Sequence, residues 1–179
     1  MFSTNTIAAK PGIIVRLQVK ETALVLALSV LIPFLIHLLP SYNGIPVGAI
    51  FLAMFFAPYF AVKYFKFHVA LLTSLAAPFM NYLITGNPRA DLIPLLTLQL
   101  ALFISASKIF SNFSSLKYLD ALSSYVVAMV ISFLALLAFP VLMSNSSLAS
   151  YFQSAFVTGL PGILLLVLMN VALIQFNKK

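Results

Sequence analysis

Six long apolar runs occupy most of this chain, and they restrict its fold more than any other feature of the sequence. Of the 179 residues, 63% are hydrophobic and only 7% are charged. A soluble domain of this length needs far more charge to cover its surface, so a lipid bilayer is the expected solvent. A helix needs roughly 20 residues to cross a hydrocarbon core of about 30 Å. The runs cover residues 22–39, 46–64, 67–84, 92–110, 121–143 and 156–176.

The runs are predicted to be helices, because lipid offers no hydrogen-bond partners to an irregular backbone. Nine of the ten Lys and Arg residues lie in alternate loops or at the chain ends, and Arg89 is the exception. The positive-inside rule assigns the basic side to the cytoplasm. The sequence therefore predicts an all-α, compact bundle of six transmembrane helices with both termini in the cytoplasm.

This topology divides the chain into three parts. Residues 22–176 form the membrane domain, and residues 177–179 form a cytoplasmic tail. Residues 1–21 are expected to be a cytoplasmic or interfacial segment, in which apolar residues surround Arg16. Such a segment could lie along the inner membrane surface, and a frayed tail is the alternative.

The residue types argue against several kinds of chemistry. The chain has no cysteine, and two histidines with three acidic residues leave little for a catalytic or metal cluster. No Gly-x-Ser-x-Gly nucleophile motif and no Walker A nucleotide-binding motif occurs. The net charge of +7 comes from residues scattered at the ends of apolar runs, which does not indicate nucleic acid binding. We expect no catalytic residue, no metal and no cofactor.

Polar residues crowd toward the predicted outer ends of the spans. Asn81 and Thr85 lie one helical turn apart and on the same face, and Arg89 is the one cation of the outer loops. Its planar guanidinium suits a carboxylate or phosphate group. Such a set is expected of a pocket that is loaded from outside. The candidate substrate-binding residues are Asn81, Thr85, Asn87, Arg89, Asp91, Gln99 and His37.

These residues also have structural interpretations. Asn87 followed by Pro88 fits the start of a helix, with Asn87 as its cap. Arg89 and Asp91 could pair in water and contribute little to stability. Gln99 could link two helices, and His37 could be an amphipathic residue at the interface.

Short motifs throughout the chain resemble the substrate-binding S components of energy-coupling factor (ECF) vitamin transporters. They are ALVLA at residues 23–27, PVGAIFLAMFFAPYFAVKY in the second span, PFMNYLITGNP ending the third, and GLPGILLLVLMNVALI in the last. The resemblance implies a prokaryotic plasma-membrane protein that captures a vitamin or related small molecule. It also implies docking through Ala23 and Ala27 onto a transmembrane coupling subunit that two cytoplasmic ATPases drive.

Two other classes of protein compete with this interpretation. A non-transporting membrane scaffold or assembly subunit would have similar spans, since a fold does not determine a function. An intramembrane enzyme is less favoured, because it would need a serine–histidine pair in a nucleophile motif or several aspartates facing the membrane. For Ala23 and Ala27, packing within the chain is the alternative to docking.

Overall fold

A computed structural model describes residues 11–42, 45, 47–139 and 153–176, and leaves the side chains of residues 11–17 and 154 undescribed. These described residues are mostly helical and contain no strand. Short 3-10 turns, η1 and η2, and a π-helical turn, η4, connect or precede the main helices. The elements are α1 (Pro11–His37), α2 (Val47–Ile50), α3 (Ala53–Tyr64), α4 (Phe67–Thr85), η1 (Ala90–Leu92), α5 (Ile93–Phe110), η2 (Ser114–Leu116), α6 (Asp120–Ala138), η4 (Gln153–Thr158) and α8 (Leu160–Phe176).

Four helical segments are long and apolar enough to cross a membrane: Gln18–His37, Phe67–Thr85, Ala90–Phe110 and Asp120–Ala138. The last helix, α8, is equally apolar but shorter. Large apolar side chains such as Leu24, Leu72 and Leu134 point outward. Small or hydroxylated residues fill much of the interior, among them Ala70, Thr73, Ser74, Ala121, Ser124, Ala128 and Ser132. This distribution is typical of helices that pack closely with one another and expose their large side chains to lipid.

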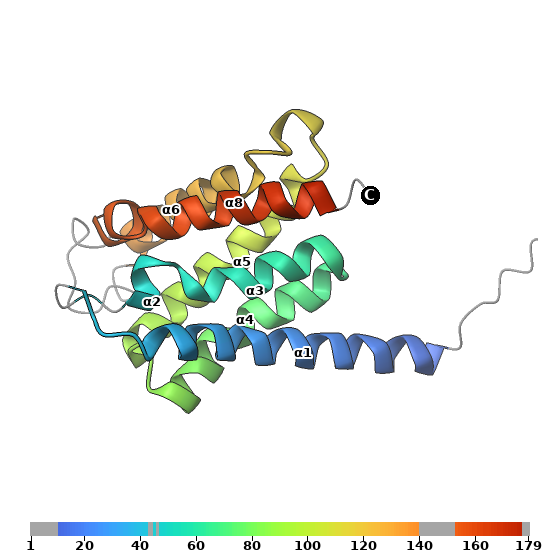
Figure 1. Ribbon diagram of the computed structural model, residues 1–179, viewed down its shortest axis with the longest axis horizontal. Helices are drawn as coiled ribbons and strands as arrows, with labels where there is room; N and C mark the ends of the chain where they lie inside the picture. Colours follow the sequence, from blue (N-terminus) through green and yellow to red (C-terminus); the bar gives the residue numbers. More distant parts are fainter. Residues whose placement is uncertain (1–10, 43–44, 46, 140–152, 177–179) are drawn as a thin grey trace, which may run out of the picture.

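The helices form a bundle in which α3 and α5 occupy the centre (Figure 1). On one side α1 packs against α4, and both contact α3. On the other side α6 packs between α5 and α8. The carboxyl ends of α1 and α4 meet the amino end of α5 at one end of the bundle, and α2 lies there as well (Figure 1). We call this end the pocket end and the opposite end, where α3 and α5 finish, the lysine end.

The second predicted span, residues 46–64, is divided into α2 and α3. Leu52 lies between them with a φ of 52°, in the left-handed region that a leucine rarely adopts. Gly162 of α8 lies directly against this break, because a Cβ built on it would be 2.5 Å from the Phe51 carbonyl carbon. The backbone of α8 therefore packs closely against the backbone at the break. Irregular backbone at membrane depth is tolerated where protein buries it.

The first helix also differs from the prediction. It begins at Pro11 and continues to His37 without interruption, whereas the predicted span began at residue 22. Proline suits the first turn of a helix, and residues 13–22 contain no glycine or proline that would break it. The amino-terminal turns of α1 extend beyond the other helices at the lysine end (Figure 1). Residues 1–10 and the predicted tail at 177–179 lie outside the described residues.

Candidate functional site

A pocket of about 420 Å³ lies at the pocket end of the bundle. Residues of α1, α3, α5 and α6 form its wall, together with α2 and the turn that follows α4. Most of the wall is apolar, and Tyr125, Met129 and Phe55 are each no more than 3% exposed. A concave, mainly apolar cavity with a few polar groups is the usual form of a small-molecule site.

Four of the seven candidate residues line this pocket: His37, Asn87, Arg89 and Gln99. They come from α1, from the turn between α4 and η1, and from α5. Asn87 and Arg89 are exposed, His37 is half-buried, and Gln99 is 4% exposed. The polar groups therefore extend from the mouth of the pocket to its buried part.

His37 lies at the carboxyl end of α1, against Gly48 of α2. A Cβ built on Gly48 would be 2.7 Å from the Cε1 atom of His37, so a larger residue at this position would displace the imidazole. In the described part of the chain, the imidazole has no hydrogen-bond partner. Its nitrogen atoms are therefore available to a ligand in the pocket.

Arg89 and Asp91 form an ion pair at the mouth. Arg89 Nη2 donates to Asp91 Oδ2 at 2.6 Å, and Nε donates to Oδ1 at 3.2 Å. The arginine side chain is 69% exposed and the aspartate side chain 30%. The ion pair between Arg89 and Asp91, which was the structural interpretation of these two residues, is thus present. Arg89 also lines the pocket, as the binding interpretation expects. Asp91 holds the guanidinium in place and does not itself line the cavity.

Gln99 lies on α5, where it is almost fully buried. Its Nε2 atom lies 3.7 Å from the sulfur of Met129 on α6. This contact joins α5 to α6 in the buried part of the bundle. Both residues line the pocket, which means that Gln99 links two helices and also faces the cavity.

Asn81 and Thr85 do not line the pocket. The Asn81 side chain is fully buried, and its Nδ2 atom donates to the carbonyl oxygens of Ser29 at 2.8 Å and Ala77 at 2.9 Å. It therefore links α4 to α1. The Thr85 hydroxyl donates to the backbone carbonyl oxygen of Asn81 at 2.8 Å and accepts from the backbone N–H of Asn87 at 3.1 Å. Both residues therefore stabilise the turn that carries Arg89, without lining the cavity themselves.

The predicted helix cap at Asn87 is absent. The Asn87–Pro88 peptide bond is cis, and the helical conformation starts only at η1 and α5. Neither of these elements has a side-chain cap. The Asn87 residue lines the pocket, and its side chain forms no helix cap.

A buried polar cluster at the lysine end was not predicted from the sequence. Asp120, the first residue of α6, forms an ion pair with Lys63 of α3. Its Oδ2 atom also accepts from Tyr59 Oη at 3.2 Å and Ser107 Oγ at 3.2 Å, and its Oδ1 atom accepts from Ser124 Oγ at 3.0 Å. The aspartate side chain is 1% exposed and the lysine side chain 15%. The cluster joins α3, α5 and α6.

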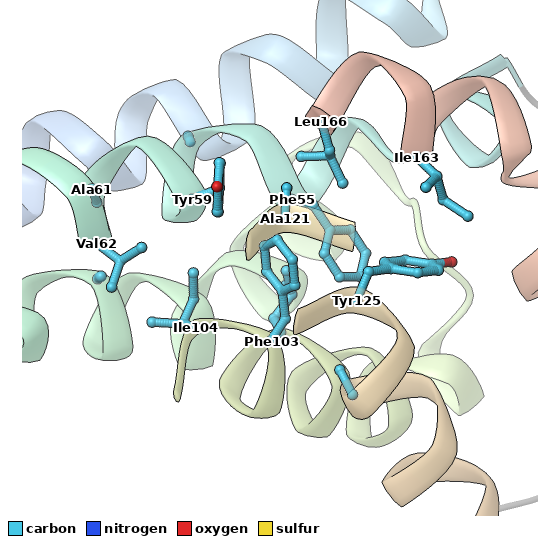
Figure 2. Packing of buried hydrophobic residues seen from close by; sticks show 14 of the residues in the cluster. Phe55, Tyr59, Ala61, Val62, Phe103, Ile104, Ala121, Tyr125, Ile163 and Leu166 are labelled. Carbon is cyan, nitrogen blue, oxygen red and sulfur yellow. The ribbon is translucent and has the colours of Figure 1, made fainter. Parts of the chain in front are cut away.

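Aromatic contacts connect this cluster with the pocket (Figure 2). The Tyr59 ring lies 5.4 Å from that of Phe103, and Phe103 lies 5.2 Å from Phe55. Phe55 in turn lies 5.6 Å from Tyr125, and the last two residues line the pocket. Two of the three helices that meet at Asp120, α3 and α6, thus provide the aromatic rings of the pocket wall, and Phe103 of α5 packs behind them.

A second hollow runs along the outside of α1 and α4. It has a volume of about 580 Å³, and Ala23 and Ala27 are exposed within it. The similar pair Ala57 and Ala61 on α3 is buried inside the bundle. Ala23 and Ala27 therefore lie on the surface of the described bundle. We call this hollow, lined by Ala23, Leu26, Ala27, Val30, Leu31, Phe34, Met80 and Ile84, the α1–α4 groove.

No family model, curated protein or solved structure matches this chain. Among the described residues, no group of three His, Cys, Asp or Glu side chains could hold a metal ion.

Proposed function

We propose that this protein is the substrate-capture subunit of an ECF-type importer. It binds a vitamin or related small molecule in the pocket from outside the cell, and delivers it inward when coupled to a transmembrane subunit and two cytoplasmic ATPases. The observation that carries the proposal is a largely apolar pocket with polar groups at its mouth, located at one end of a bundle of apolar helices.

The charge distribution supports an outward-facing pocket. Lys63 lies in the last turn of α3, and Lys66 directly precedes α4. Lys108 lies in the last turn of α5, and Lys117 lies in the following connection. All four are at the end of the bundle opposite the pocket, whose mouth has Arg89 paired with Asp91. In the proposed topology the chain crosses the plasma membrane six times, with both termini and these lysines in the cytoplasm.

Cysteine labelling tests this topology, because the natural chain has no cysteine. In intact cells, an impermeant thiol reagent is expected to label an Arg89→Cys variant. It is expected to label a Lys117→Cys variant only after the membrane is opened. Labelling of Lys117→Cys from outside would reverse the orientation and place the pocket on the cytoplasmic side.

The capture role is tested by the small molecules that co-purify with the protein, identified by mass spectrometry. Leu96 on α5 lines the pocket, so Leu96→Trp is expected to fill part of the cavity and to reduce the bound molecule at least tenfold. Leu98 lies on the same helix with similar burial and does not line the pocket. Leu98→Trp serves as the matched control, and equal loss in both variants would contradict binding in this pocket.

The α1–α4 groove is the proposed docking face for the coupling subunit. Ala23 and Ala27 are small and exposed there, which permits close approach of a partner helix. Ala23→Leu and Ala27→Leu are expected to abolish co-isolation of the ATPases with the tagged chain while the pocket keeps its ligand. Ala138→Leu, at an exposed position of α6, is the control. Loss of the ligand with the partners retained would place these alanines in internal packing.

A further inference from the structure

We infer that the pocket selects a small, apolar monoanion. Its body is a flat system of one or two fused rings held in the buried part, and its single anionic group, a carboxylate, is bound by Arg89 at the mouth. This inference rests on the proposed function, because it concerns the chemistry of the same pocket.

The size of the cavity limits the body of the ligand. A volume of about 420 Å³ is near the lower end of the roughly 300–1,000 Å³ that small-molecule pockets span. Because a ligand fills only part of such a space, one or two fused rings with a short substituent fit. A dinucleotide or a large macrocycle does not.

The burial of the lining residues places the apolar part of the ligand. Tyr125 is 0%, Met129 2% and Phe55 3% exposed, so the deep part of the pocket offers rings and a thioether. Phe55 and Tyr125 meet edge to face, with ring centroids 5.6 Å apart. Aromatic side chains favour edge-to-face or offset contacts with a further ring, and methionine adapts to an irregular outline. The polar groups at this depth are few, namely the Gln99 amide and the Tyr125 hydroxyl, so the ring system carries at most a few polar atoms there.

The anionic group belongs at the mouth. Arg89 is the one Lys, Arg, Asp or Glu residue among the described residues that line the pocket. A guanidinium has five N–H donors, and two of its nitrogen atoms already donate to Asp91. The remaining donors can hold a carboxylate in a two-point contact. The imidazole of His37 and the amide of Asn87, which also line the pocket, supply further hydrogen bonds.

The charge balance at the mouth favours a ligand with one negative charge over a ligand with two. Asp91 neutralises Arg89 and remains within hydrogen-bond distance of it. A dianion such as a phosphate monoester would face the aspartate with only one cation to compensate it. Repulsion from Asp91 therefore opposes a dianion more strongly than a monoanion.

The test uses four naphthalene probes with the same ring body: naphthoate, naphthyl phosphate, naphthalenemethanol and naphthylmethylammonium. The protein has no cysteine, so a single Ala53→Cys substitution places one thiol in the pocket wall, at a buried residue of α3. In nanodiscs of zwitterionic lipid, the rate of labelling by a small water-soluble methanethiosulfonate reports occupancy. Leu39→Cys, exposed at the same end of the bundle and outside the pocket, controls for probe that enters the lipid.

Naphthoate is expected to halve the labelling rate of Ala53→Cys at a concentration at least tenfold lower than each of the other three probes. In the Ala53→Cys/Arg89→Gln protein, this preference over naphthalenemethanol is expected to disappear. None of the probes is expected to slow labelling of Leu39→Cys. Ala155→Cys, on the pocket wall near Tyr125, replaces Ala53→Cys if that variant does not fold.

Several results would overturn the inference. Equal protection by naphthalenemethanol would show that the pocket does not require an anionic group. Stronger protection by naphthyl phosphate would show that the pocket prefers two negative charges to one. Protection by the ammonium probe would show that the pocket selects a cation. Failure of every probe, or of the thiol reagent to reach either cysteine, would show that the pocket does not admit this body. None of these results would contradict the proposed function, which depends on a co-purifying ligand and on the partner subunits. Selective protection without any such ligand or partner would instead contradict the proposed transport role.

Discussion

Replacement of Asp120 with alanine is expected to lower the free energy of unfolding by about 3–5 kcal/mol, the usual effect of breaking a buried ion pair from one side. The substitution leaves Lys63, whose side chain is 15% exposed, without its counter-charge. It also removes the acceptor of three hydroxyl groups, those of Tyr59, Ser107 and Ser124. Equilibrium unfolding of the purified protein in mixed detergent micelles measures the effect.

The second ion pair of the described residues provides the control for this experiment. Arg89 and Asp91 are much more exposed than Lys63 and Asp120, so Asp91→Ala is expected to cost no more than about 1 kcal/mol. In the double variant Lys63→Ala/Asp120→Ala, no unpaired charge remains. Its destabilisation should therefore be smaller than the sum of the two single variants. Additive losses would show that the two charges do not stabilise each other.

Substitution of Gly162 with alanine is expected to cost about 3 kcal/mol of stability, at the upper end of overpacking effects. The added Cβ would lie 2.5 Å from the carbonyl carbon of Phe51 and 2.6 Å from its oxygen. These are backbone atoms, so the clash can be relieved only by moving α8 or the break between α2 and α3. Because Leu52 lines the pocket, the variant should also lose the bound small molecule.

Unfolding measurements and ligand retention in Gly162→Ala check both parts of this prediction. Leu164→Ala lies on the same helix at a position that is 58% exposed, and it is expected to change stability by less than about 0.5 kcal/mol. Normal stability with a retained ligand in Gly162→Ala would mean that α8 does not approach the break as closely as the structure shows.

The sequence predicted the helical elements well where a single local property determines them. Apolar runs with charged ends specify a membrane helix regardless of what the rest of the chain does, and α4 and α5 follow the predicted runs closely. The helix α6 starts as predicted but ends at Ala138, whereas the predicted run continued to residue 143. The break at Leu52 could not be predicted, because the segment that packs against it, at Gly162, is remote in sequence. A glycine in an apolar helix does not indicate which segment will cross it.

In the candidate site too, local sequence properties predicted some residues, and contacts with distant segments determined the others. Arg89, Asn87, Gln99 and His37 were found because polar residues near the outer ends of spans are unusual. Asn81 is also a polar residue near the outer end of a span, but its side chain donates a hydrogen bond to the α1 backbone. Helical periodicity predicts which residues share a face of a helix, but it does not predict which neighbouring helix that face contacts. Asp120 was missed because it stands at the start of an apolar run, where a carboxylate is expected simply to favour the helix N-terminus. One signal was available: it is one of only three acidic residues in the chain.

The ion pair between Lys63 and Asp120 has a consequence for biosynthesis. The two residues are 57 positions apart, so at roughly 5–20 residues per second the lysine emerges from the ribosome several seconds before the aspartate. During that interval Lys63 can remain solvated by keeping its ammonium group at the membrane surface. Only the arrival of α6 allows α3 to draw this charge into the bundle. A nascent chain that stalls before Asp120 therefore keeps an uncompensated cation at the membrane, a mark by which quality control could distinguish it from the finished protein.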